Sequence, residues 1–383
     1  RFRLVTWTVA LSMLMICCNQ IVVAQSTTVC EFNANVNNYG IDGDMYANVP
    51  FANSDDWFEN PTAWPGTGIG IVGSTAATAK PPLQISAAAF KALLQSAGSV
   101  GGRNIEYEQR MAVPFGTVIP SPAGGVNVML DAVGARDNFS TSSTLDSSMF
   151  AGNGNKNGDN PTTWSIGVGN VPAKNDIIDA GGHIRRYYSA PGNPGDLWGY
   201  AFATTLATNG DSHVDFEVFR ESPIFDALGG VISNSGPAAT GGHTAGSFNA
   251  SGTVAAPGDL LVSIDYSNGG TNPTASVRVW VNPTALGGGI TSFAAYNALP
   301  GRVFEFTGVF DSGTGTNGYG YAEIRPLTSG TCLLYAKTNK DAPCKIPGTS
   351  WGNIFGSGAD YQDSLECLQL VSVGINFSAF GLD

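Results

Sequence analysis

The amino-acid sequence predicts an all-β fold, a two-sheet β-sandwich of the jelly-roll type with one short helix. Fifty glycines, together with plentiful Asn, Ser and Thr, are typical of short strands joined by turns. Hydrophobic residues make up 43% of the chain, which excludes a disordered composition. Apolar and polar residues alternate in about a dozen short segments. A parallel α/β fold would place a helix between successive strands, and a propeller or solenoid would repeat every ~20–50 residues; neither pattern occurs.

The first segment, residues 1–24, is typical of a secretory signal peptide. A short basic start precedes an apolar run, and Val22 and Ala24 occupy the −3 and −1 positions before Gln25. We therefore expect an exported chain that begins near Gln25 and is secreted or held at the cell surface.

Two other readings of this leader remain open. One is a retained membrane anchor, but Asn19 interrupts the apolar run, which is shorter than the ~20 residues of a membrane span. The other is a lipoprotein attached through Cys17 or Cys18, although no small residue precedes either cysteine in the way a lipobox requires. After cleavage we expect residues 25–383 to form a single large β-sandwich domain, truncated at its C-terminus, with no membrane span.

The expected helix covers residues 86–95. Ser86 can cap its first turn, Ala and Leu favour the helical backbone, and Gly98 lies just beyond its end. A polar loop is expected over 137–163. The period-two pattern predicts strands at 104–113, 126–133, 176–188, 197–204, 212–220, 260–266, 276–281, 302–306, 319–324, 332–337 and 368–377.

The charge pattern excludes two classes of partner. The formal net charge is −12, and removal of Arg1 and Arg3 with the leader makes it −14. No run of Lys or Arg occurs anywhere in the chain. Such a chain is a poor match for nucleic acid or for an anionic membrane surface.

Four cysteines follow the leader: Cys30, Cys332, Cys344 and Cys367. An even number in an exported chain favours disulfides, and four cysteines allow three pairings. Three of them lie within one C-terminal stretch, so we expect at least one bond there. Zinc is the alternative, but the stretch contains no C-x-x-C pair.

Several segments, taken in order, carry a family resemblance. They are IDGD at 41–44, NSDDWF at 53–58, RMAVP at 110–114, KNGDNP at 156–161 with Trp164, KNDI at 174–177, HIRR at 183–186, DLW at 196–198, VDFEVF at 214–219, DLLVSIDY at 259–266, VRVW at 277–280 and NFSAFGLD at 376–383. In these segments the chain is similar to the N-terminal β-sandwich region of large, secreted, repeat-bearing surface proteins of Bacteroidetes-type bacteria. In that family, Ig-like or other repeats and a sorting domain follow. The resemblance implies an adhesin-like or surface-associated role and transfers no catalytic residues.

Asp215 and Glu217 are the candidate catalytic residues. They lie two apart on a predicted strand and so share one face, ~6–7 Å apart, as a glycosidase acid pair could. Laminarinase-type jelly rolls carry Glu-x-Asp-x-x-Glu, which this strand does not match. The competing interpretation is an ordinary strand with Val214, Phe216 and Val218 in the core and solvated acids. We expect the latter, because no neighbour in the sequence would tune the two carboxyl groups differently.

The sequence contains one cluster of candidate metal ligands. Asp42, Asp44, Asp55 and Asp56 cluster among turns and could supply oxygen ligands to a structural Ca²⁺, although the segment is no EF-hand loop. Ordinary turn chemistry explains these residues equally well. The three histidines, at 183, 213 and 243, fall on separate elements without ligand spacing, and we expect them to be structural or solvent-facing.

Six tryptophans offer a carbohydrate platform: Trp57, Trp64, Trp164, Trp198, Trp280 and Trp351. Trp57, Trp64 and Trp351 stand among turns and are expected to be exposed, where they could stack on sugars. Trp198 and Trp280 stand in apolar strand patterns, for which core packing is the usual outcome.

These observations lead to one functional expectation and one alternative. We expect a secreted, non-enzymatic, adhesin-like module that is structural or ligand-binding, with surface glycans or other extracellular proteins as partners and no cofactor except a possible calcium ion. The alternative is a carbohydrate-active jelly roll, either a glycan-binding module or a glycosidase. A cleft containing both acids and an aromatic side chain would favour the alternative.

Overall fold

A computed structural model describes most of the predicted domain. The predicted signal peptide, Cys30 and Trp64 lie outside the described residues. Those residues are 34–36, 39–46, 55–58, 70–72, 84–96, 107–111, 119–120, 126–141, 145–151, 156–190, 193–221, 224–226, 231–233, 236–267, 272–313, 316–327, 332–341, 343–356 and 360–381.

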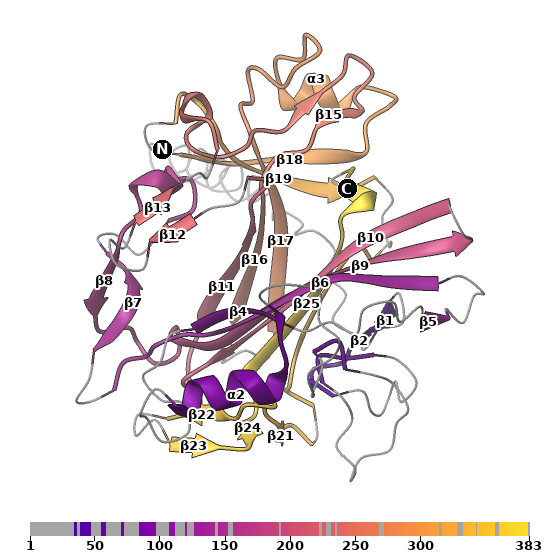
Figure 1. The fold of residues 1–383 in the computed structure, drawn as a ribbon. Helices are drawn as coiled ribbons and strands as arrows, with labels where there is room; N and C mark the ends of the chain where they lie inside the picture. Colours follow the sequence, from indigo (N-terminus) through magenta and orange to yellow (C-terminus); the bar gives the residue numbers. More distant parts are fainter. Residues whose placement is uncertain are drawn as a thin grey trace, which may run out of the picture.

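Two β-sheets dominate the fold (Figure 1). All their strand pairs are antiparallel except β3 with β4. The larger sheet has eight strands in the order β20 (Leu334–Thr338), β25 (Leu370–Asn376), β10 (Asn193–Thr205), β9 (Ile177–Ala190), β6 (Val126–Arg136), β4 (Tyr107–Met111) and β3 (Gln84–Ile85), with β5 (Ile119–Pro120) paired to β6. The smaller has five in the order β11 (Ser212–Val218), β16 (Leu260–Ser267), β17 (Asn272–Val281), β19 (Gly320–Pro326) and β18 (Phe304–Ser312).

The main hydrophobic core lies between these sheets, which confirms the all-β sandwich. The inward-facing residues of alternating strands form this core. Val262 and Val277 of the smaller sheet and Val371 and Val373 of the larger are all buried members of one cluster. Burying each such side chain contributes ~1.5–3 kcal/mol. All the strands expected from the period-two pattern are present; the jelly-roll type remains a prediction.

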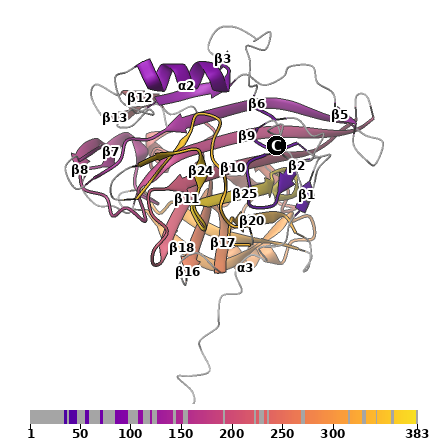
Figure 2. The same cartoon turned by 90° about the horizontal axis from the view of Figure 1, so that it is seen from below.

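A second core covers the opposite face of the larger sheet, so that sheet is buried on both sides (Figure 2). Phe90 of the helix α2 (Ala87–Ser96) packs edge-on against Trp351, with ring centroids 4.9 Å apart. Trp57 packs against Phe202 at 4.7 Å. Both tryptophans are 1% exposed. Our prediction that Trp57 and Trp351 are exposed is therefore wrong, and neither can offer its face to a surface ligand.

The predicted helix is confirmed as α2, and Ser86 caps it by accepting a hydrogen bond from the Ala89 amide at 3.2 Å. A second, short helix, α3 (Phe293–Asn297), was not predicted. Ser292 caps it in the same way, through the Ala295 amide at 3.1 Å. The described residues also form three 3₁₀ turns: η2 (Pro161–Thr163), η3 (Ala238–Thr240) and η5 (Ser378–Phe380).

The segment expected to be a polar loop, 137–163, contains a strand. That strand, β7 (Asp146–Phe150), pairs with β8 (Ile166–Gly169), so a hairpin stands where we predicted only loop. The remaining small antiparallel pairs are β1 (Ala34–Val36) with β2 (Tyr39–Ile41), β12 (Ile224–Asp226) with β13 (Val231–Ser233), β14 (Ser247–Phe248) with β15 (Val254–Ala256), β21 (Ile346–Pro347) with β24 (Ser364–Leu365), and β22 (Asn353–Phe355) with β23 (Asp360–Gln362).

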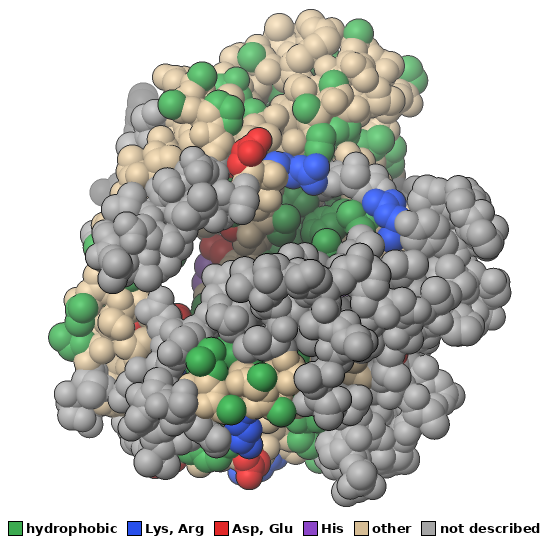
Figure 3. All heavy atoms as spheres, in the orientation of Figure 1, with side chains coloured by type: hydrophobic (Ala, Val, Ile, Leu, Met, Phe, Trp, Pro, Cys, Tyr) green, Lys and Arg blue, Asp and Glu red, His purple; other side chains and the backbone are tan. Residues whose placement is uncertain are grey.

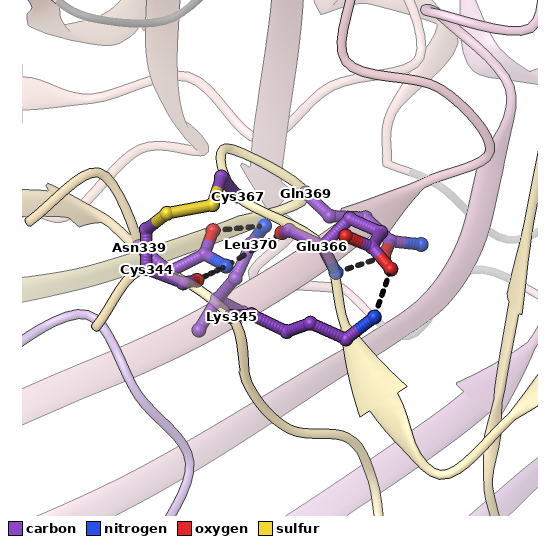
Figure 4. Close-up of a disulfide and its surroundings, with 7 residues drawn as sticks. All are labelled: Asn339, Cys344, Lys345, Glu366, Cys367, Gln369 and Leu370. Carbon is purple, nitrogen blue, oxygen red and sulfur yellow. Dashed lines mark hydrogen bonds and ion pairs between the residues drawn. A yellow bond between two sulfur atoms is a disulfide. The ribbon is translucent and has the colours of Figure 1, made fainter. Parts of the chain in front are cut away.

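One predicted disulfide is present, between Cys344 and Cys367 (Figure 4). Asn339 stabilises the segment that this disulfide closes, because its Nδ2 donates to the carbonyls of Cys344 and Glu366 at 2.8 and 2.7 Å. Cys332 is disulfide-bonded as well. These bonds confirm the expectation of at least one C-terminal disulfide. No helix in the described ranges is both long and apolar enough to span a membrane.

Candidate functional site

A cleft of about 650 Å³ lies against the outer face of the five-stranded sheet, at its β11 edge. Alternation along β11 turns Val214 into the core, so the odd-numbered residues face the opposite way. The hairpin β7–β8 and the turn that follows β7 form the other wall. The residues lining the cleft are Phe150, Lys156, Asn157, Trp164, His213, Asp215, Glu217, Phe219, Arg278 and Asp311.

Asp215 is held in its charged form. One carboxylate oxygen lies 2.8 Å from His213 Nε2, and the other accepts a hydrogen bond from Asn157 Nδ2 at 2.6 Å. Burial alone would raise the pKa of Asp215, but hydrogen bonds from His213, Ser263 and Asn157 outweigh it and lower the pKa. The hydrogen bond to Asp215, with a second to Asp265, raises the pKa of His213 to about 9 despite partial burial. The pair is therefore a cation and an anion at neutral pH.

Glu217 has the opposite environment. Burial raises its pKa to about 7, and the hydrogen bond that Tyr321 donates to its Oε1 only partly opposes this. His243 Nδ1 lies 3.6 Å from the same oxygen and 3.3 Å from Asp259 Oδ2. His243 is itself fully buried, with its ring centroid 4.0 Å from that of Trp280. Glu217 thus joins a buried polar network and titrates near neutral pH.

These observations overturn one expectation. We predicted solvated acids without differential tuning, but the Asp215 and Glu217 side chains are only 23% and 13% exposed, and their pKa values move in opposite directions. Burial raises the pKa of Glu217, whereas hydrogen bonds lower that of Asp215: the largest of these comes from His213, two residues away on β11, and another from Asn157 in the turn after β7. Alternation predicted which way the acids face, but not what covers them.

Aromatic rings form one wall of the cleft. Trp164 stands between Phe150 and Phe219, with centroid distances of 5.2 and 6.1 Å. Trp164 is 5% exposed, and its indole N–H finds no acceptor within the described part of the chain. Buried N–H groups normally have a partner, and this one belongs to a side chain that lines the cleft. The sequence places Trp164 among the six tryptophans that could form a carbohydrate platform, but assigns it neither to the core nor to the surface.

Charges of both signs lie at the far end of the cleft. Arg278 Nη1 is 3.9 Å from Asp311 Oδ2, and Lys156 donates to the Ala151 carbonyl at 3.1 Å. Carboxylates, cations, an amide and an indole N–H therefore converge beside aromatic faces. Such a lining can donate to and accept from many hydroxyl groups at once. In the view of Figure 3 the surface is hollowed, and acidic, histidine and hydrophobic side chains lie deep within the hollow.

The predicted calcium ligands are only partly brought together. Asp42, Asp44 and Asp56 each place an oxygen within 4.8 Å of the others. Asp55 does not join them, because its Oδ2 accepts from Arg185 Nη2 at 2.8 Å in a buried ion pair. Burial raises the pKa of Asp42 to about 6, and burial together with the charges of Asp42 and Asp44 raises that of Asp56. Three such carboxyl groups fit a hard divalent cation.

Calcium is expected to stabilise the protein more at pH 7.5 than at pH 5. A carboxyl group whose folded pKa is raised loses stability as the pH rises from its unfolded pKa, ~4, through the folded value of about 6. A bound cation offsets the repulsion between the ionised carboxylates, and this benefit is available only above that pH window. At ~100 times its Kd, Ca²⁺ would add ~2.7 kcal/mol. Thermal unfolding with Ca²⁺ or EGTA at both pH values measures this.

Asp44→Asn should abolish the calcium effect, and the exposed Asp360→Asn should retain it. An equal gain at both pH values, or a gain that survives in Asp44→Asn, would contradict a site at these carboxylates.

The three histidines do not form a metal site in the described structure. His183 is 2% exposed and belongs to the larger sheet, whereas His213 and His243 flank the two acids of the cleft from opposite sides. The single acidic cluster found among the described residues is that of Asp42, Asp44 and Asp56.

Comparison with known proteins adds no assignment, since no family model, curated protein or solved structure matches this chain.

Proposed function

We propose that this protein is a secreted or cell-surface, non-enzymatic module that binds a carbohydrate in the cleft beside β11. The observation that carries the proposal is the convergence of Asp215, Glu217 and the unpartnered Trp164 N–H within one cleft. Sugars present hydroxyl groups along an edge and C–H groups on a face, and the lining offers polar partners for the first and aromatic rings for the second. Its volume is within the ~300–1,000 Å³ of ordinary ligand sites.

Export is the second part of the proposal. It rests on the leader at 1–24, on the disulfide between Cys344 and Cys367, and on the resemblance to secreted, adhesin-like surface proteins. A net charge of −12 without basic clusters is consistent with extracellular glycans or proteins as partners rather than nucleic acid. Calcium at Asp42, Asp44 and Asp56 is the one cofactor we propose.

Glycoside hydrolysis is the second candidate. It is favoured by one observation, the opposite pKa shifts of Asp215 and Glu217, because a carboxyl pair tuned apart can divide the roles of acid and base or nucleophile. We place binding first because both carboxylates are already engaged: Glu217 by Tyr321 and Asp215 by His213 and Asn157.

A glycan array followed by titration calorimetry tests the choice. Wild-type protein is expected to bind a glycan without cleaving it, and Asp215→Asn with Glu217→Gln to weaken binding at least ~10-fold, since each hydrogen bond to a charged group contributes ~1.5–3 kcal/mol. Trp164→Phe keeps an aromatic ring but removes the N–H and part of the indole's stacking surface, so a ~5-fold loss is expected. Val168→Ala, at an exposed position on β8, serves as the control.

Three outcomes separate the candidates. Binding that depends on the acids and on Trp164, without release of reducing ends, supports the module. Hydrolysis by wild type that the double variant lacks would replace it with the glycosidase. Absence of binding to every glycan, or binding that neither variant changes, would refute carbohydrate recognition at this cleft.

A further inference from the structure

A second cavity lies on the other side of β11, between the two sheets. Its volume is about 500 Å³, and its wall is mostly apolar. The larger sheet contributes residues of β6, β9, β10 and β25, and the smaller contributes Val262 and four residues of β11, namely Asp215, Phe216, Glu217 and Val218. The cavity exists because the two sheets differ in width: eight strands face five, and β11 is the last strand of the smaller sheet. Part of the inner face of β6 and β9 therefore has no opposing strand from that sheet.

The cavity opens where large hydrophobic side chains are exposed. Val133 of β6, Ile184 of β9 and Val218 of β11 are 37%, 37% and 36% exposed, and all three line it. Single exposed hydrophobic residues are ordinary at a protein surface, whereas three from different strands around one opening are typical of an interaction site. Figure 3 shows hydrophobic side chains at the bottom of a hollow.

β11 also has a free edge. It pairs with β16 from Ser212 to Val218, and within the described part of the chain it pairs with no second strand. No backbone hydrogen bond between described residues leaves β11 on its other side. An exposed edge beside an apolar opening is a template for another strand, and folded proteins usually block such edges.

We propose that β11 accepts an added strand from a partner, an extended peptide in which apolar side chains alternate with basic ones. Residues opposite Val214, Phe216 and Val218 would point inward, as those do, and would fill the cavity between the sheets. Residues opposite Asp215 and Glu217 would point outward beside two carboxylates, where opposite charge is the favoured cross-strand partner. Asp265 on the neighbouring strand, which is 68% exposed, adds a third carboxylate to that face, so three carboxylates share it with one cation, His213, which pairs with Asp215 and Asp265.

The length and charge of the strand follow from the same geometry. β11 has seven residues, about 23 Å at ~3.3 Å per residue, so a peptide of similar length saturates the edge. Three of its side chains would enter the cavity. The net charge of −12 favours the approach of a basic segment. The cavity meets the carbohydrate cleft at Asp215 and Glu217, which line both, but strand addition is argued from the edge and inner face of β11 and does not depend on carbohydrate binding.

Four synthetic nine-residue peptides test strand addition to the full chain by fluorescence anisotropy. The first alternates Val and Lys; the second has the same composition in two blocks; the third alternates Val and Glu; the fourth is the first with N-methyl groups on alternate amides. The first is expected to bind at least ~10-fold more tightly than any other. Equal binding of the block or N-methylated peptides would overturn the proposal, because neither can add a regular strand with this alternation.

Cavity variants locate the site. At Gly182 an added Cβ would meet only Val133 Cγ1, at 3.5 Å, so Gly182→Val fits and occupies the cavity. It should weaken binding of the first peptide at least ~10-fold. Val218→Asp, at an exposed position, should do the same without burying a larger side chain. Val309→Leu, at an exposed position on the opposite edge strand β18, should leave it unchanged.

A different occupant would also be visible. Binding of lauric acid, a single-chain amphiphile, that Gly182→Val removes, in a protein that binds none of the peptides, would assign the cavity to an alkyl ligand and refute strand addition. Peptide binding that no cavity variant changes would place the peptide elsewhere and refute the proposal as well.

Discussion

Replacement of Asp179 by alanine is expected to lower the free energy of unfolding by about 3–5 kcal/mol. Asp179 is fully buried on β9 and holds Arg136 of β6, which is 1% exposed, through bonds of 2.6 and 2.9 Å. Its Oδ1 also accepts from the indole of Trp351 at 3.0 Å. Removal of the carboxylate leaves a guanidinium charge in the interior without its counter-ion and removes the acceptor of a buried tryptophan.

Urea denaturation followed by far-UV circular dichroism measures this loss. The matched control is Asp211→Ala, because Asp211 is exposed in the loop before β11 and its side chain makes no hydrogen bond with a described residue; a change within ~0.5 kcal/mol is expected. Arg136→Met combined with Asp179→Leu should recover much of the stability, since apolar replacement of a whole buried pair is often neutral. A loss below 1 kcal/mol for Asp179→Ala would show that the pair does not act as a desolvated unit.

Removal of the Cys344–Cys367 disulfide is expected to cost about 3 kcal/mol. The cysteines are 23 residues apart, and a cross-link of that span restricts the unfolded chain by roughly this amount in the loop-entropy description. Within the loop lie β21, β22, β23 and β24, short strands that also carry Trp351 against the larger sheet. They have few backbone partners of their own, so their order depends on the closed loop.

The double variant Cys344→Ser with Cys367→Ser, compared with wild type by urea denaturation, measures the effect. Serine substitution is preferable to a reducing agent, because a reductant would also attack the bond of Cys332. The variant Ser364→Ala, within the same loop, provides the control. A loss of less than ~1 kcal/mol would indicate that β21–β24 are held by packing alone.

The strands could be predicted because their signal is local. Val214, Phe216 and Val218 alternate with polar residues, and the structure forms β11 there. Ser86 likewise predicts the start of α2, whose first turn it caps. The prediction that Trp57 and Trp351 are exposed is wrong because a position among turns does not show which distant residues will pack over a side chain. Phe90 and the carboxylate of Asp179, both distant in sequence, bury Trp351.

In the candidate site, too, the local pattern predicts some features and the tertiary structure supplies the others. The shared face of Asp215 and Glu217 follows from a spacing of two on a strand. Burial raises the pKa of Glu217, and hydrogen bonds from His213, two residues away, and from Asn157, 58 residues away, lower that of Asp215. The spacing of two places His213 beside Asp215, but no spacing encodes the burial of Glu217 or the approach of Asn157, which come from the assembled sandwich and the β7–β8 hairpin.

The position of β25 has a consequence for the order of assembly. β25 follows every other strand in the sequence, yet it lies inside the larger sheet, between β20 and β10, and all seven of its residues are buried. A chain that emerges from the ribosome or from an export channel, N-terminus first, therefore presents β10 with one side unpaired until residues 370–376 arrive. Pairing so distant in sequence is slow to form. The sandwich can therefore close only when nearly the whole described chain is available for pairing.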